Sequence, residues 1–99
     1  MKHFVIELSY RVPLSRIEES SAAHRTYIQA GVDQGLILCA GPRVPREGGI
    51  ILARADSQAT LEAFFAADPY LREGLAEYRY LEFLPLRHQA ALADWVGPA

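Results

Sequence analysis

The hydrophobic periodicity of the chain switches between two patterns in an order that few folds accommodate. From His3 to Tyr10, apolar and polar residues alternate, which is the period of a strand with one apolar face. Intervals of three or four, typical of one face of a helix, then separate Leu14, Ile17, Ser21, His24 and Ile28. Ser15 and Glu18 have the spacing of a capping box, so we expect this helix from about Arg16 to Gln34.

The rest of the chain predicts two strands, a helix and a final strand. Short apolar runs predict strands over Leu36–Ala40 and Gly49–Ala55, joined by a loop rich in Gly and Pro. Ser57 can cap the second helix, which should stop at Asp68 because a residue before proline disfavours helical geometry. The last strand is expected over Glu77–Leu84, just before a proline.

This order of elements defines a fold class. We predict an α+β domain of the ferredoxin-like kind, βαββαβ, with a four-stranded antiparallel sheet. A chain of 99 residues is long enough for one such domain. We expect the domain to span residues 1–85, and residues 86–99 to form a C-terminal extension. That extension is expected to be a short helix or tail that packs on the body or on a partner subunit.

The sheet carries large apolar residues on both faces, although two helices can cover only one. In the last strand, Leu81 and Phe83 oppose Tyr78 and Tyr80. Exposed apolar surface of this extent indicates that something covers the second face. We therefore predict a homodimer that pairs sheet against sheet; the alternative is that the tail with Trp95 folds back over the face. The pattern leaves open which face of the second and third strands meets the helices.

Charge and composition argue against several classes of partner. Ten basic and twelve acidic residues give a net charge of −2, so we expect neither a nucleic acid nor an anionic membrane as partner. No apolar run approaches the roughly 18 residues of a membrane span. The single Cys39 is typical of a reducing compartment, and we expect a cytoplasmic protein. The three histidines lack metal-ligand spacing, so no metal or other cofactor is expected.

Two residues are candidates for chemistry. His24 lies in mid-helix on the same face as Ile17 and Ile28, so its imidazole should face the sheet. The alternative is a core histidine that hydrogen bonds a backbone carbonyl. Asp68 is the second candidate, and its alternative is a helix N-cap with Pro69 at the first helical position.

Several short motifs at these separations resemble the YciI-related family, from about His3 to Pro85. In chain order they are His24 in the helix, Gly35-Leu36 opening a strand, Ala40-Gly41-Pro42, Gly48-Gly49 before the third strand, and Ala67-Asp68-Pro69-Tyr70 followed by Gly74-Leu75 and Tyr78. The resemblance implies the fold of the dimeric α+β barrel proteins and a His–Asp pair as active site, which falls here on His24 and Asp68. It also implies small-molecule chemistry, since at least one member is a dehydrochlorinase for a chlorinated hydroxyhydroquinone and most members have no assigned reaction.

The chain departs from this family at one position. An arginine often precedes the histidine by three residues, and Ser21 stands there in this chain. Any role of that arginine in holding an anionic substrate would then pass to another residue. The candidates are Arg16, Arg25 and the loop residues Arg43 and Arg46.

Two functions from different classes remain open. The first is a small cofactor-free lyase or isomerase for a small compound such as an aromatic one, with His24 as base and Asp68 as its orienting partner. Predicted substrate contacts are Tyr70, Arg43 and Tyr27. The second is a non-catalytic module that binds a small molecule or a protein. A solvent-reachable ring nitrogen of His24 beside a cavity would favour the enzyme, and a buried, saturated imidazole would favour the module.

Overall fold

A computed structural model describes residues 1–98 of the chain. It confirms the predicted βαββαβ order, with a further short helix between the second helix and the last strand. The elements are β1 (Lys2–Tyr10), α1 (Leu14–Asp33), β2 (Ile37–Pro42), β3 (Gly48–Ala55), α2 (Gln58–Phe65), α3 (Pro69–Arg72), β4 (Ala76–Phe83), η1 (Ala90–Leu92) and α4 (Ala93–Val96). Within residues 1–98, no helix combines the length and the apolar character that crossing a membrane requires.

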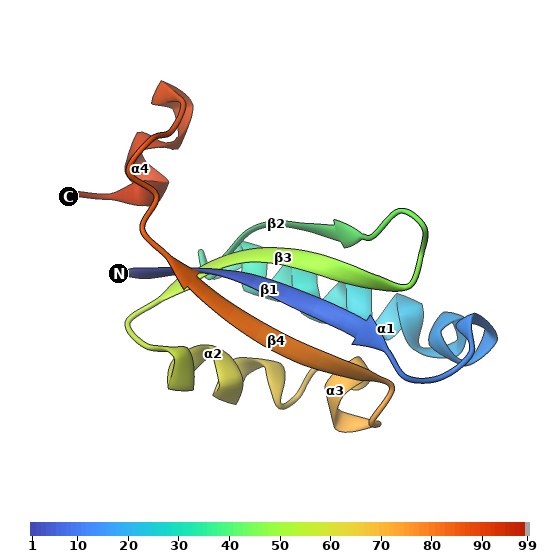
Figure 1. Cartoon of the computed structure of the whole chain (residues 1–99). Helices are drawn as coiled ribbons and strands as arrows, with labels where there is room; N and C mark the ends of the chain where they lie inside the picture. The colour runs from blue at the N-terminus through green and yellow to red at the C-terminus, as the bar shows by residue number, and fades with distance from the viewer. Residues whose placement is uncertain (99) are drawn as a thin grey trace.

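The four strands form one antiparallel sheet in the order β2-β3-β1-β4. β1 is central, and its Ile6 lies opposite Ile51 of β3 and Tyr80 of β4. The helices α1, α2 and α3 lie on one side of this sheet (Figure 1). The confirmed architecture is therefore two layers, with one face of the sheet covered by helices.

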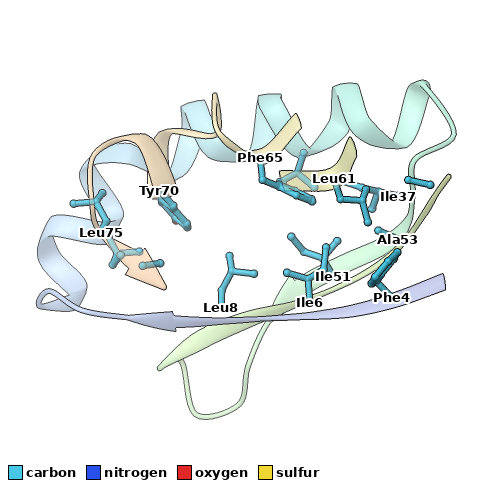
Figure 2. Packing of buried hydrophobic residues seen from close by; sticks show 14 residues of the cluster. Phe4, Ile6, Leu8, Ile37, Ile51, Ala53, Leu61, Phe65, Tyr70 and Leu75 are labelled. Carbon is cyan, nitrogen blue, oxygen red and sulfur yellow. The ribbon is translucent and has the colours of Figure 1, made fainter. Parts of the chain in front are cut away.

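The core lies between the sheet and the helices (Figure 2). The alternation in β1 predicts it well, because Phe4, Ile6 and Leu8 are almost completely buried. From the other side, α2 contributes Leu61 and Phe65, which are fully buried. Burying one such side chain stabilises the fold by about 1.5–3 kcal/mol. This layer of apolar contacts holds α2 against the sheet.

The predicted start of the first helix is wrong. α1 begins at Leu14, and Pro13 is its N-cap with φ −58°. The Pro13 carbonyl accepts hydrogen bonds from the backbone N–H groups of Arg16 and Ile17. Because the proline ring already fixes the backbone at the helix start, Ser15 lies inside the first turn and does not cap it.

Other boundaries shift by a few residues. β2 runs from Ile37 to Pro42 rather than from 36 to 40, with a bulge between Ile37 and Cys39. α2 ends at Phe65, three residues before the predicted end. The predicted cap of α2 is confirmed, because the Ser57 side chain accepts a hydrogen bond from the Thr60 backbone N–H.

The face of the sheet opposite the helices is only partly covered. The C-terminal tail lies at one end of it, where His3 Nε2 is 3.1 Å from the Val96 carbonyl oxygen (Figure 1). At the same end, Arg54 donates to the Trp95 carbonyl and stacks over the Trp95 ring at 4.1 Å. Leu81 and Phe83 remain 39% and 45% exposed. The last residue of the predicted extension 86–99 lies outside the described residues.

Candidate functional site

The side chains of His24 and Asp68 meet across the helical layer. Nδ1 of His24 lies 2.7 Å from Oδ1 of Asp68. His24 comes from the middle of α1, and Asp68 comes from the turn between α2 and α3. The Asp68 side chain is fully buried, whereas the His24 side chain keeps 15% of its surface exposed. A carboxylate can only accept, so the imidazole donates from Nδ1 to Asp68.

Three donors converge on the buried carboxylate of Asp68. Besides His24, the backbone N–H of Tyr70 donates to Oδ1 at 3.3 Å, which makes Asp68 the N-cap of α3. The Tyr78 hydroxyl of β4 donates to Oδ2. Burial raises the pKa of Tyr78, and the charge and hydrogen bond of Asp68 raise it further, so this hydroxyl keeps its proton. A buried carboxylate needs hydrogen-bond donors of this kind because no water solvates it, and here the donors also fix the orientation of the Asp68 side chain.

The imidazole of His24 is held by stacking as well as by its hydrogen bond. Its ring lies against the ring of Tyr70, with centroids 3.8 Å apart and planes 7° from parallel. Tyr70 is itself buried, and its hydroxyl lies 2.8 Å from the Ser21 hydroxyl. No hydrogen-bond partner for Nε2 of His24 exists among residues 1–98. The hydrogen bond to Asp68 therefore occupies Nδ1, and Nε2 stays available to a molecule bound beside the ring.

His24 lines a cavity of about 520 Å³ between α1, the edge of the sheet and the loop after β2. That volume is within the usual range for small-molecule sites, about 300–1,000 Å³. Its walls are mainly apolar, with Leu8, Ile28, Val32 and Ile51 among them. Its polar side chains are those of Tyr10, His24, Arg25, Gln29, Arg46 and Tyr70.

Of the predicted contact residues, the structure brings only Tyr70 to this cavity. The Tyr27 hydroxyl donates to the Phe64 carbonyl, and its ring stacks on Phe64 outside the cavity wall. Arg43 is likewise outside the wall, whereas Arg46 of the same loop is part of it. Arg16 pairs with Glu73 at 2.7 Å and lowers the pKa of that carboxyl.

The sequence motifs include Tyr78 but do not identify it as a partner of Asp68. The sequence does indicate which face of the strand Tyr78 occupies, because Tyr78 and Tyr80 alternate with charged residues in β4. The register places Tyr78 opposite the buried Leu8, on the face that meets the helices. The short N-terminal turn of α3 then brings Asp68 to the Tyr78 hydroxyl.

Two neighbouring tyrosines provide a matched test of this network. The Tyr80 hydroxyl is buried and has no hydrogen-bond partner among the described residues. Tyr78→Phe would leave an acceptor atom of buried Asp68 without its donor, and we expect a loss of about 1–3 kcal/mol in unfolding free energy. Tyr80→Phe removes an unpartnered hydroxyl and should leave stability unchanged or raise it. Urea denaturation of both variants measures this difference, and equal losses would contradict the assignment.

The described residues contain no group of three or more His, Cys, Asp or Glu side chains placed to hold a metal ion. The polar side chains of the cavity are hydrogen-bond donors and acceptors. Among them, His24 both lines the cavity and is hydrogen bonded to the buried Asp68, which is not part of the wall.

Comparison with known proteins agrees with this architecture. No curated protein matches the chain. A similar solved structure is 5-chloro-2-hydroxyhydroquinone dehydrochlorinase from Burkholderia phenoliruptrix in complex with 2,5-dihydroxybenzoquinone. The TM-score is 0.67 at 21% sequence identity, and the match covers 82% of this chain and 90% of that chain, which shows a shared fold. A sequence model of the YCII-related domain matches residues 1–84. The chain thus belongs to the YCII-related domain family, as its motifs predicted.

Proposed function

We propose that this protein is a small lyase or isomerase in which His24 acts as general base and Asp68 orients it. The observation that carries the proposal is the asymmetry of the imidazole. Nδ1 is bound to a buried carboxylate, while Nε2 has no partner among residues 1–98 and the ring lines a cavity. A core histidine of purely structural role would be expected to have both nitrogens satisfied.

The contacts of Asp68 suit this role. A hydrogen on Nδ1 leaves the lone pair of Nε2 available to take a proton from a bound molecule. The carboxylate then stabilises the imidazolium that forms, and it is kept in place by Tyr78 and the backbone of Tyr70. A positioned base of this type typically contributes about 10²–10⁴-fold in rate. Proton abstraction from a hydroxyl, or from a carbon next to a carbonyl, is the reaction class that this geometry supports.

The substrate class proposed is a small ring compound with acidic hydroxyl groups. The cavity has apolar walls and a volume of about 520 Å³, which suits a single substituted ring. The structural relative named above carries out a dehydrochlorination, whose net change is the loss of one proton and one chloride ion. A base such as His24 can begin that reaction by taking the proton.

Chloride release from 5-chloro-2-hydroxyhydroquinone tests the proposal. We expect the protein to accelerate the release of one chloride ion per molecule, as read by ion chromatography under nitrogen. The supporting result is a rate proportional to protein concentration and absent from heat-denatured protein. A rate equal to that without protein would contradict this substrate class for the chain.

We also propose that two copies pair through the open face of the sheet. The support is the exposure of Leu81 and Phe83. The tail leaves both side chains partly uncovered, although Phe83 lies opposite His3, at the end of the sheet where the tail packs. Light scattering at micromolar concentration should give about twice the chain mass of 11.0 kDa.

Leu81→Asp should shift the protein to a monomer, because a charge would lose water in the interface. Val44→Asp, in a loop at 96% exposure, is the matched control that should remain dimeric. A monomeric wild-type protein would contradict the proposal.

The thiol of Cys39 supports a reducing compartment such as the cytoplasm as the location of the protein. This cysteine is free and exposed on β2. Exposed free thiols oxidise readily in secretory compartments and persist where glutathione keeps them reduced. Fractionation of the source cells, with the protein recovered beside a cytoplasmic marker, tests this location.

A further inference from the structure

The charge on the cavity wall is unbalanced. Arg25 and Arg46 line the cavity, and none of the lining residues is acidic. Neither arginine has a carboxylate within 4.0 Å among the described residues. The nearby Asp68 is buried behind His24 and already receives three donors. The cavity therefore presents positive charge without a protein counter-charge.

Arg46 differs from Arg25 because a neutral, buried hydroxyl group holds its guanidinium. Its Nη2 donates to the Ser21 hydroxyl oxygen at 3.2 Å. The neighbouring Tyr10 side chain raises the pKa of the guanidinium. The described residues give Arg25 no such hydrogen bond, although both arginines are exposed. Arg46 is thus a positioned cation, although it comes from a loop.

The Ser21 hydroxyl sets the direction of these bonds. It donates its single hydrogen to the Ile17 carbonyl at 3.0 Å, so towards Tyr70 and Arg46 it can only accept. Tyr70 therefore donates its hydroxyl hydrogen to Ser21, while its ring carries the imidazole of His24 on one face. Through Ser21 and Tyr70, both buried, the loop arginine is fixed relative to the base.

A guanidinium has five N–H donors, and the bond to Ser21 uses only one of them. The remaining donors suit an oxygen that carries negative charge, because charge-assisted hydrogen bonds of this kind are roughly twice as strong as neutral ones. We propose that Arg46 binds an ionised oxygen, a phenolate or a carboxylate, of the molecule in the cavity and so orients that molecule against His24. The inference rests on the proposed function and specifies its substrate class: a single-ring compound with one anionic oxygen.

Affinities for benzoate and its uncharged analogue benzamide, followed by NMR titration, test the role of Arg46. The two probes have the same ring and nearly the same shape. The wild type should bind benzoate more tightly than benzamide. Arg46→Gln should weaken benzoate binding about tenfold, which is the scale of one charge-assisted hydrogen bond. The same variant should leave benzamide binding within about twofold, because the ring contacts are unchanged.

Arg87→Gln is the matched control, since it removes the same charge from an exposed residue of the tail, outside the cavity wall. It should leave both affinities unchanged. Equal weakening in Arg46→Gln and Arg87→Gln would show a long-range charge effect and overturn the inference. Equal wild-type affinity for the two probes, or binding of neither at millimolar concentration, would also overturn it.

The outcome is separable from that of the proposed function. If benzoate is not preferred but His24→Gln still abolishes turnover, the role of Arg46 fails and proton transfer stands. If Arg46 gives the preference for benzoate but His24→Gln leaves turnover unchanged, anion binding stands and the base assignment fails.

Discussion

Replacing His24 with glutamine should reduce the rate of chloride release by about 10²–10⁴, the usual contribution of a positioned general base. A glutamine amide can still donate a hydrogen bond to Asp68, but it has no lone pair basic enough to take a proton. The expected loss is therefore chemical rather than structural. Steady-state rates measured for the purified variant should fall in kcat, while the melting temperature changes by only a few degrees.

His88→Gln is the matched control, because His88 is an exposed histidine of the tail and is not part of the cavity wall. It should keep the wild-type rate. A His24→Gln variant with wild-type kcat would remove the imidazole from the mechanism. A parallel loss in both variants would point to an effect of the substitution outside the site.

Replacing Gly48 with alanine should cost about 3 kcal/mol or more of unfolding free energy, at the upper end of the overpacking effects seen in protein cores. A Cβ at this position would lie 1.8 Å from the backbone carbonyl oxygen of Leu8, inside van der Waals contact. Gly48 pairs with Ser9 in the sheet, and its carbonyl accepts from the Arg43 N–H, so neither strand can move away freely. Thermal unfolding should show a fall of about 10 °C or more, since 1 kcal/mol corresponds to roughly 4–8 °C in a domain of this size.

Gly41→Ala is the control for this substitution. A Cβ at Gly41 would meet no atom within 4 Å, and its backbone has no positive φ. Its unfolding free energy should stay within about 0.5 kcal/mol of the wild type. Similar stability of the two alanine variants would mean that β1 and β3 are not packed as closely as the structure has them.

Much of the fold could be predicted from the sequence because the apolar pattern is strong. Phe4, Ile6 and Leu8 alternate cleanly, and burial follows that alternation. The boundary of α1 failed where two local signals compete, a capping box at Ser15 and a proline that already sets the backbone at residue 13. Periodicity shows that a helix exists, but it fixes the ends only weakly.

Some residues of the candidate site could likewise be predicted from the sequence, and others could not. His24 and Asp68 can be singled out from their places in a helix and before a proline, and the structure brings them together. Arg43 and Arg46 cannot be told apart from sequence, since they lie three residues apart in one loop without a period. The loop conformation decides which arginine reaches the cavity. The register of the strands decides that Tyr78 reaches Asp68.

We propose that His24 presents an unprotonated Nε2 to the cavity because Asp68 holds the hydrogen on Nδ1. Long-range ¹H–¹⁵N NMR at about pH 9, where a typical histidine is neutral, reads this tautomer directly. We expect a protonated Nδ1 and a bare Nε2 in the wild type, and a shift towards the other tautomer in Asp68→Asn. A wild-type imidazole with its hydrogen on Nε2 would contradict the account, because that nitrogen could not take a proton from a bound molecule.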